Sequence, residues 1–275
     1  MIFVIKANGK RRIFNPNKVL RTCRRMGLSR EESNEVLEYV ESKLYDNIPT
    51  SKILDLIFEK AREIHPKFEH SIDLRRAISL LRPKPDFESF IGNILMEYGY
   101  EITRNQIIPG KCVEHEIDAI AKKNGETIHV EIKHHFNFHT YTSLRIMLEA
   151  WAVYQDLREG FKLGLHEFDV KKTIVISNTK LSEHAKKYAI CKGLEYIGWR
   201  YPGRKGLEYL IEKKKIYPIT MLRGVRRKVI ERLCEYGYVT IKQIVESDLN
   251  KISKKTGLSL RELREISKRA ELLLE

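Results

Sequence analysis

Residues 114–133, which read EHEIDAIAKKNGETIHVEIK, decide the fold of the chain. The Asn124-Gly125 pair is the strongest short signal for a β-hairpin, because both central positions of that turn require positive φ. With these two residues as the turn, every facing pair on one side of the hairpin is apolar, and the register is self-consistent. Those pairs are Ile117–Ile132, Ala119–Val130 and Ala121–Ile128.

The other face of this hairpin gathers charged side chains. Asp118 is expected opposite Glu131, with Cβ atoms roughly 5 Å apart, and Glu116 opposite Lys133. Two facing carboxylates are destabilising unless a positive charge lies between them, and Mg²⁺ binds one or two carboxylates together with water and phosphate oxygens. Lys133 could steady a scissile phosphate there or activate a water. The alternative is a solvated sheet face on which acids and bases alternate by chance.

The stretch from Asp118 to Glu131-Ile132-Lys133 resembles the PD-(D/E)xK nuclease signature, with Ile117-Asp118 in place of the usual Pro-Asp. The surrounding segment resembles the Mrr-type restriction endonuclease-like domain. This resemblance implies a bound Mg²⁺ or Mn²⁺, held by the Asp118 and Glu131 carboxylates and the Ile132 carbonyl. It also implies that Lys133 is the catalytic lysine.

A helix that carries an acid often precedes the hairpin in that family. Here residues 85–98 form the candidate helix and Glu88 is the matching acid, although a glutamate in a first helical turn is also ordinary compensation of the helix dipole. After the hairpin, helices at 142–157 and 182–191 alternate with strands at 173–177 and 196–199, as in an α/β domain. Three further residues could reach a phosphate, a metal or a water, or could simply be polar: Gln106, His134 and His135.

Charge is unevenly distributed along the 275 residues. The net charge of +14 favours a polyanionic partner, and a solvated basic surface on a heat-loving protein is the alternative. Proline-rich or charged stretches at 82–85 and 212–218 indicate linkers. They separate segments 1–84, 85–212 and 213–275, whose net charges are +7, −1 and +8. We therefore expect an α/β multidomain protein with two basic ends and a mixed-sheet domain between them that keeps the carboxylates.

Composition excludes several classes of protein. At 42% hydrophobic residues the chain can fill a core, and no apolar run approaches the ~20 residues that span a bilayer. The N-terminus lacks the layout of a signal peptide. Four scattered cysteines argue against a zinc knuckle and against a disulfide framework: Cys23, Cys112, Cys191 and Cys234. We expect a cytoplasmic protein without a membrane partner.

The N-terminal segment predicts a hairpin at Asn8-Gly9 followed by four helices. Helix starts are indicated at Asn15-Pro16, at a capping box that begins at Ser29, and at Thr50; the fourth helix is expected over 71–81. This order, with VIKANG at 4–9 and FNPNKV at 14–19, resembles the ATP-cone, a nucleotide-binding regulatory module. The resemblance implies that ATP or dATP is bound, by Lys6, Asn8, Gly9, Lys18 and Thr50.

Lysines at the mouth of a hairpin-helix junction offer point charges to phosphates, which fits that implication. The sequence departs from the ATP-cone in two places, since Ala7 stands where the family usually has arginine and Arg12 where an acid is sometimes found. The alternative is that Lys6 and Lys18 are solvated and that Thr50 is only a helix cap.

The C-terminal segment resembles helix-hairpin-helix motifs, an all-α fold in which a glycine lets backbone N–H groups approach a phosphate. One glycine precedes a helix and another joins two amphipathic stretches. The implied DNA-contacting residues are Gly224, Arg226, Arg227, Lys254, Lys255, Gly257 and Arg261, with Lys228 beside them. Such contacts position the protein and do not read sequence. The alternative is a helical bundle that packs on the central domain or dimerises.

Together these features predict a metal-dependent DNA endonuclease that holds duplex or branched DNA and responds to ATP or dATP. No P-loop is present, so nucleotide binding without translocation is expected. A homodimer or higher oligomer is an option that the sequence leaves open. The main alternative is a nucleotide-responsive DNA-binding regulator with an inactive nuclease core, and a second is an RNA nuclease.

Overall fold

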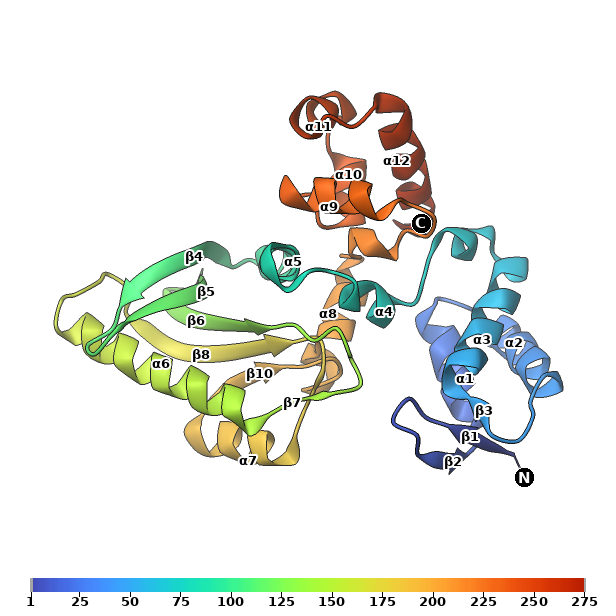
Figure 1. Cartoon of the computed structure of the whole chain (residues 1–275), viewed down its shortest axis with the longest axis horizontal. Coiled ribbons are helices and arrows are strands. Elements are labelled where there is room, and N and C mark those ends of the chain that lie inside the picture. The colour runs from blue at the N-terminus through green and yellow to red at the C-terminus, as the bar shows by residue number, and fades with distance from the viewer. Residues whose placement is uncertain (1, 275) are drawn as a thin grey trace. The chain divides into compact units, whose positions relative to one another are not determined.

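The computed structural model describes residues 2–274, apart from the side chains of residues 66 and 67. The chain divides into two compact units, Met1–Ser71 and Ile72–Glu275 (Figure 1). The first boundary therefore falls earlier than the linker predicted at residues 82–85. Residues 72–84 belong with the second unit for the reasons of packing given below.

The N-terminal unit combines a small sheet with helices. Its sheet has the order β2-β1-β3, with β1 antiparallel to β2 and parallel to β3. A buried apolar cluster that includes Val36, Val40 and Ile48 fills the space between sheet and helices. The elements are β1 (Phe3–Ile5), β2 (Arg11–Ile13), α1 (Pro16–Arg25), α2 (Arg30–Ser42), β3 (Ile48–Pro49), α3 (Thr50–Ile64) and a 3-10 helix (Pro66–His70).

The helix caps and the hairpin predicted for this unit are present, with one exception. The Asn15 side chain accepts a hydrogen bond from the Asn17 N–H at 3.0 Å, and Ser29 and Glu32 form both bonds of the capping box. The Asn8-Gly9 hairpin is confirmed, since β1 and β2 pair across it. Thr50 was wrongly predicted as a cap: it is the first residue of α3, and the cap position is held by Pro49, whose ring has no hydrogen-bond acceptor.

The second unit is built on a five-stranded mixed sheet of order β10-β8-β6-β5-β4 (Figure 1). Strands β4, β5 and β6 are antiparallel neighbours, whereas β6, β8 and β10 run parallel. The strands are β4 (Glu101–Pro109), β5 (Glu114–Lys123), β6 (Glu126–Lys133), β8 (Val170–Ser177) and β10 (Glu195–Ile197), with β7 (Tyr141–Thr142) and β9 (Lys180–Leu181) forming a separate pair. The predicted mixed sheet is therefore confirmed.

The predicted hairpin is present and its turn has the expected conformation. Asn124 and Gly125 have φ of 51° and 77°. The ladder contains Ala119–Val130 and Ala121–Ile128 as predicted, but it ends at the first of these pairs. The pairs expected beyond it are absent from the ladder: Ile117–Ile132, Asp118–Glu131 and Glu116–Lys133.

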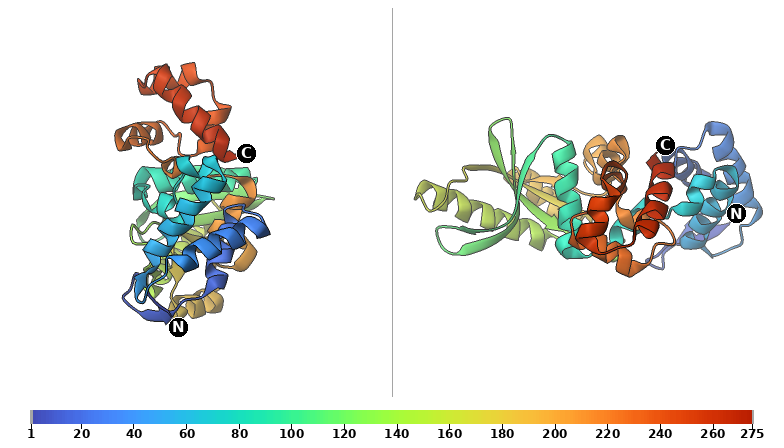
Figure 2. Two further views of the ribbon diagram at one scale, coloured as in Figure 1. Left: turned by 90° about the vertical axis from the view of Figure 1, so that its right-hand side faces the viewer. Right: turned by 90° about the horizontal axis from the view of Figure 1, so that it is seen from above.

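Helices cover both faces of this sheet. On one face lie α6 (Leu144–Lys162) and α7 (Glu183–Lys192), which pack with Val175 and Tyr196 in one apolar cluster. On the other face, α5 (Glu88–Glu97) packs Phe90, Ile91 and Ile94 against the alanines and valine of the hairpin. Figures 1 and 2 show α6 running along the length of the sheet.

The C-terminal helices share a core with α5. They are α8 (Leu207–Lys214), α9 (Arg227–Glu235), α10 (Ile241–Glu246), α11 (Leu249–Thr256) and α12 (Leu260–Leu274). One continuous apolar cluster joins the hairpin, α5 and buried residues of α9 to α12. The predicted boundary at 212/213 is thus not a boundary of packing, because side chains from both sides of it fill the same core.

Helix α4 (Leu74–Ser79) explains why residues 72–84 go with the second unit. Ile78 and Leu81 are fully buried in the core that contains α5. The Thr220 hydroxyl donates to the Ala77 carbonyl at 2.6 Å, and the Ile72 N–H donates to the Met221 carbonyl at 3.0 Å. The helix predicted over 71–81 is therefore shorter than expected and lies outside the N-terminal unit.

The observed fold is an α/β protein with a mixed central sheet, a helical C-terminal region and a small N-terminal α/β segment. Within residues 2–274, no helix is both long and apolar enough to cross a membrane.

Candidate active site

The candidate site forms where the β5–β6 ladder stops. The Asp118 carboxylate accepts a hydrogen bond from the Ile132 N–H through Oδ2 at 2.8 Å. A side chain thus takes the place of a strand carbonyl, and the two strands part at this point. The bond fixes Asp118, whose side chain is buried, against the Glu131-Ile132 segment. The sequence predicted that Asp118 and Glu131 lie close together, but through side chains facing each other across a regular ladder, and the ladder ends before that pair.

Glu131 is the least compensated carboxylate of the site. Among the residues that the structure describes, none donates a hydrogen bond to it or forms an ion pair with it. Burial, followed by the charge of Asp118, raises its pKa to about 7, although the charge of Lys133 opposes the shift. A partly buried carboxylate with a carboxylate neighbour and no partner is costly unless a cation joins it.

Glu88 joins the same group from the first turn of α5. Its side chain is buried, and burial together with the charge of Asp118 raises its pKa to about 7. This placement argues against simple compensation of a helix dipole, which a solvated glutamate would provide equally well. The structure therefore brings Glu88, Asp118 and Glu131 into one electrostatic neighbourhood.

Lys84 is the residue that sequence reasoning missed. Its ammonium lies 3.4 Å from Glu88, 2.7 Å from Glu116 and 3.4 Å from Asp118 (Oε1, Oε1 and Oδ1 respectively). The hydrogen bond to Glu116, followed by the charges of Asp118 and Glu88, raises the pKa of Lys84. The predicted ion pair between Glu116 and Lys133 is absent, because Glu116 turns to Lys84 instead. The spacing of Lys84 and Glu88 was the available signal, but the surrounding prolines indicated a linker.

The donor set suits a hard divalent cation. Carboxylate and carbonyl oxygens are the ligands of Mg²⁺ and Mn²⁺, and Mg²⁺ keeps several waters or phosphate oxygens. Within residues 2–274, no three His, Cys, Asp or Glu side chains are placed to enclose an ion by themselves. A metal here would therefore be held by Asp118 and Glu131, with the Ile132 carbonyl, water and substrate oxygens completing its shell.

Three candidate helpers have structural partners instead. The Gln106 amide donates to the Arg104 carbonyl of its own strand at 2.9 Å. The His134 ring contacts the Ile78 carbonyl at 3.1 Å and packs beside Phe87, and burial lowers its pKa. His135 is bound through its backbone to the Asn178 side chain. None of these contacts points to a role in chemistry.

The C-terminal region brings its two predicted glycine turns to one surface hollow. Gly224 and Gly257 both have positive φ, 77° and 73°, as the predicted turns require. Arg226 reaches across to Glu262 at 2.6 Å, and Arg232 donates to the Thr256 carbonyl at 2.8 Å. The hollow is lined by Arg226, Arg227, Lys228, Val229, Arg232, Thr256, Leu258 and Glu262.

The remaining basic residues predicted for this region lie close by in the chain and are exposed. Lys254 and Lys255 belong to the last turn of α11, and Arg261 to the first turn of α12. Arg226 and Arg227 are each paired with a glutamate, Glu262 and Glu231. These two arginines therefore carry less uncompensated charge than the sequence suggested, and the lysines carry more of it.

In the N-terminal unit, strand pairing brings two of the predicted nucleotide-site residues to one edge. Ile5 pairs with Pro49 in a parallel register, so Lys6 and Thr50 follow at the same end of β1 and β3. Helix α3 begins there without a side-chain cap. Lys18 is exposed on the first turn of α1, and Asn8 accepts a hydrogen bond from the Lys10 N–H at 3.3 Å.

Comparison with known proteins places the second unit in a class. Residues 82–197 match a family model described as "Restriction endonuclease", which spans α5, the hairpin and the rest of the sheet. Residues 217–274 match a model described as "AF1548-like, C-terminal". The residues of the candidate site therefore lie within a restriction endonuclease-like domain.

A relative that is matched over almost its whole length is found in Archaeoglobus fulgidus. That uncharacterized protein is 36% identical over 184 residues, which make up 67% of this chain and 99% of the relative. A crystal structure of a protein of unknown function, AF1548, is also 36% identical, with a TM-score of 0.58, and covers 67% of this chain and 94% of its own. The chain belongs to the family of the Archaeoglobus fulgidus protein, with a restriction endonuclease-like domain and an AF1548-like C-terminal region.

The position of Lys84 leads to a test without DNA. We expect Lys84→Ala to lower the free energy of unfolding of the metal-free protein by about 1–2 kcal/mol, between the values for a surface pair and a buried pair. Because Mg²⁺ would replace the missing positive charge, it should stabilise Lys84→Ala more than the wild type. Urea unfolding with and without Mg²⁺ measures both effects.

Lys111→Ala is the matched control for this experiment. Lys111 is as exposed as Lys84, at 53%, and its ion pair with Glu159 at 2.8 Å lies away from the site. That substitution should cost under about 1 kcal/mol and leave the response to Mg²⁺ unchanged. Equal behaviour of the two variants would show that Lys84 is an ordinary surface lysine.

Proposed function

We propose that this protein is a metal-dependent DNA endonuclease that hydrolyses phosphodiester bonds at Asp118, Glu131 and Lys133. The observation that carries the proposal is the hydrogen bond from the Ile132 N–H to Asp118, because it holds a buried acid beside an uncompensated Glu131. The restriction endonuclease family match supports the reaction class. Glu88 is proposed as an auxiliary acid of the same site.

The side chains divide the work according to their positions. Asp118 directs Oδ2 to the backbone, which leaves Oδ1 on the side of Lys84 and the other acids. Glu131 and Asp118 would hold Mg²⁺ or Mn²⁺ with the Ile132 carbonyl, and the bound ion supplies charge stabilisation and a water of lowered pKa. Lys133, two residues beyond Glu131 on the same strand, would balance negative charge that develops on the phosphate.

The raised pKa values set the direction of the pH dependence. A metal ligand must be ionised, so metal binding and cleavage should strengthen as pH rises through about 7, where Glu131 loses its proton. The free energy of unfolding of the metal-free protein depends on pH in the opposite direction. The pKa of Glu131 is higher in the folded protein than its unfolded value near 4.5, so the protein loses stability as pH rises from about 4.5 to 7.

The first test is a cleavage assay on plasmid and branched DNA with Mg²⁺ or Mn²⁺, at pH values on both sides of 7. Asp118→Asn keeps an oxygen for the Ile132 N–H but removes the charge, so we expect the rate to fall roughly 100-fold or more with the fold intact. Glu159→Gln, a surface substitution, serves as the control. Undiminished cleavage by Asp118→Asn would remove Asp118 from the mechanism.

Two alternatives appear as outcomes of the same assay. No cleavage under any condition, together with retained DNA binding, would favour a regulator with an inactive nuclease core. Preferential cutting of RNA in a parallel reaction would favour the RNA nuclease.

We further propose that the C-terminal region holds the DNA backbone in the manner of helix-hairpin-helix motifs. The support is the shared hollow of the two glycine turns and the exposed lysines Lys254 and Lys255 beside it. If both lysines contact phosphates, the Lys254→Glu/Lys255→Glu variant should bind DNA more weakly at all sequences. The slope of log affinity against log salt should fall by about 2. Filter binding over a salt series measures it.

Lys162→Glu is the control, because Lys162 is exposed at the end of α6, away from the glycine turns. The double variant changes the net charge by −4 and the control by −2, so a loss of binding free energy only twice that of the control would reflect net charge alone. The C-terminal region would then be a packing module.

For the N-terminal unit we propose an ATP-cone that binds ATP or dATP and regulates the nuclease. The support is the meeting of Lys6, Thr50 and the uncapped start of α3 at one edge, where N–H groups and an ammonium suit phosphates. Calorimetry should show nucleotide binding that weakens roughly tenfold or more in Lys6→Ala. Lys10→Ala, an exposed lysine in the same hairpin, should bind as the wild type. Absence of binding would leave a structural or oligomerisation module.

A further inference from the structure

A cavity of about 470 Å³ lies at the edge strand β10, and it extends from the α5 face of the sheet, opposite Glu131, around that edge to residues of α7. Its floor is formed by alternate residues of neighbouring strands. One of them is Val130, which directly precedes Glu131 in β6. Because successive side chains of a strand point to opposite faces, Val130 and Glu131 point away from each other. All floor residues from β5, β6 and β8 are apolar: Ala121, Ile128, Val130 and Ile174. None of the residues proposed for DNA cleavage lines this cavity.

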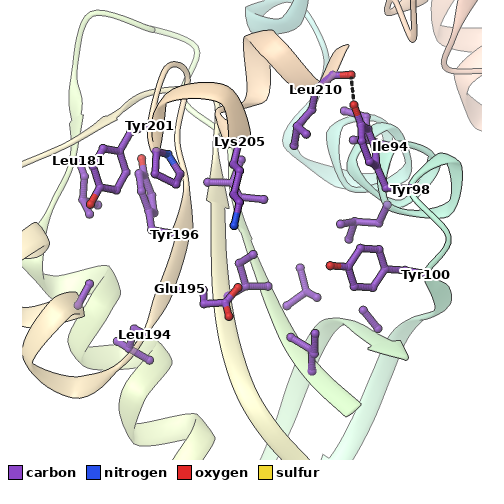
Figure 3. A pocket seen from close by; sticks show the side chains of 18 of the residues that line it. Ile94, Tyr98, Tyr100, Leu181, Leu194, Glu195, Tyr196, Tyr201, Lys205 and Leu210 are labelled. Carbon is purple, nitrogen blue, oxygen red and sulfur yellow. Dashed lines mark hydrogen bonds between the residues drawn. The ribbon is translucent and has the colours of Figure 1, made fainter. Parts of the chain in front are cut away.

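The walls of the cavity are aromatic, and each contains one tyrosine whose hydroxyl is fixed by a hydrogen bond. Figure 3 shows Tyr98 and Tyr100 on one side and Tyr196 and Tyr201 on the other. The Tyr98 hydroxyl donates to the Leu210 carbonyl at 3.0 Å, which ties α5 to α8. The Tyr196 hydroxyl donates to the Thr179 carbonyl at 3.0 Å. The two walls are thus held in place before any ligand arrives.

Charged side chains at the cavity are mostly positive. Three lysines and one glutamate line it: Lys123, Lys186, Lys205 and Glu195. Lys123 donates to the Tyr98 carbonyl, and Lys186 pairs with Glu183 at 2.6 Å. Among the described residues, the side chains of Lys205 and Glu195 have no hydrogen-bond or ion-pair partner. Figure 3 shows Lys205 extending toward the interior, between Tyr196 and Tyr98.

We propose that this cavity is a binding site for a small organic anion with an apolar body. Its volume lies within the ~300–1,000 Å³ of small-molecule sites, which are also apolar pockets with a few polar groups that orient the ligand. The apolar floor and tyrosine walls select the body of the ligand. The two lysines without a carboxylate partner, Lys123 and Lys205, outweigh Glu195 and select its negative charge. Lys205 is the ammonium that meets the anion, because Lys123 and Lys186 already have partners.

Two kinds of ligand combine a negative charge with an apolar body, a flat aromatic anion and an aliphatic carboxylate. The probe for the first is 8-anilinonaphthalene-1-sulfonate, whose fluorescence rises in an apolar site, and the probe for the second is decanoate. With the full chain we expect saturable binding of one sulfonate probe per chain. Displacement by decanoate would assign an aliphatic ligand, and failure of decanoate to displace it would assign an aromatic one.

Variants at exposed lining positions test the site without threatening the fold. Lys205→Glu reverses the charge that meets the anion, and Ile190→Asp adds a negative charge beside the cavity at a side chain that is 73% exposed. Each should weaken probe binding roughly tenfold through repulsion of the anion. Lys192→Glu, on the same helix as Ile190 but outside the cavity lining, should leave binding unchanged.

Absence of saturable binding, or equal binding by Lys205→Glu, Ile190→Asp and wild type, would overturn the proposal. Urea unfolding of each variant confirms that the probe reports the folded state. Asp118→Asn separates this site from the nuclease, since that variant should bind the probe normally whatever its effect on DNA cleavage.

Discussion

The second unit depends on one hydrogen bond, from the Ile132 N–H to the Asp118 carboxylate. It ends the β5–β6 ladder without leaving the Ile132 N–H unpaired, which a buried strand could not tolerate. The same bond fixes one oxygen of Asp118 and frees the other. The same hydrogen bond therefore ends the backbone pairing of the two strands and fixes the position of the Asp118 carboxylate.

The negative charges around this bond are partly neutralised by Lys84, which lies outside the hairpin. Three acids from two elements, Glu88, Glu116 and Asp118, meet the ammonium of Lys84. Without that charge their mutual repulsion would oppose the close packing of α5 on the sheet. Glu131 has no hydrogen-bond or ion-pair partner among the described residues, and burial raises its pKa. The fold stores this unfavourable energy at the point where a divalent cation would relieve it.

Sequence patterns predicted features that depend on near neighbours. The Asn124-Gly125 turn, the Ser29 capping box and the alternation of helices and strands follow from rules that span a few residues. Asp118 and Glu131 could be brought together because a hairpin has a calculable register. Only the i,i+4 contact of Lys84 with Glu88 is local, and the prolines around it indicated a linker. The contact of Lys84 with Glu116 crosses 32 residues, and no local pattern encodes it. The end of the β5–β6 ladder could not be predicted either, because the Asp118 side chain takes the place of a backbone acceptor for the Ile132 N–H.

The bonds between α4 and residues 220–221 have a consequence for how the protein can be divided. Residues 72–81 and residues 216–222 are far apart in the chain, but they are joined by hydrogen bonds and fill one core, which connects the beginning of the second unit to its C-terminal helices. A fragment limited to residues 85–212 would expose Phe87, Phe90 and Ile94 and would lack their partners. The smallest piece expected to keep its shape begins at Ile72 and includes the C-terminal helices. The central sheet and the C-terminal helices share one core and are expected to be inherited together, whereas the N-terminal unit has a core of its own.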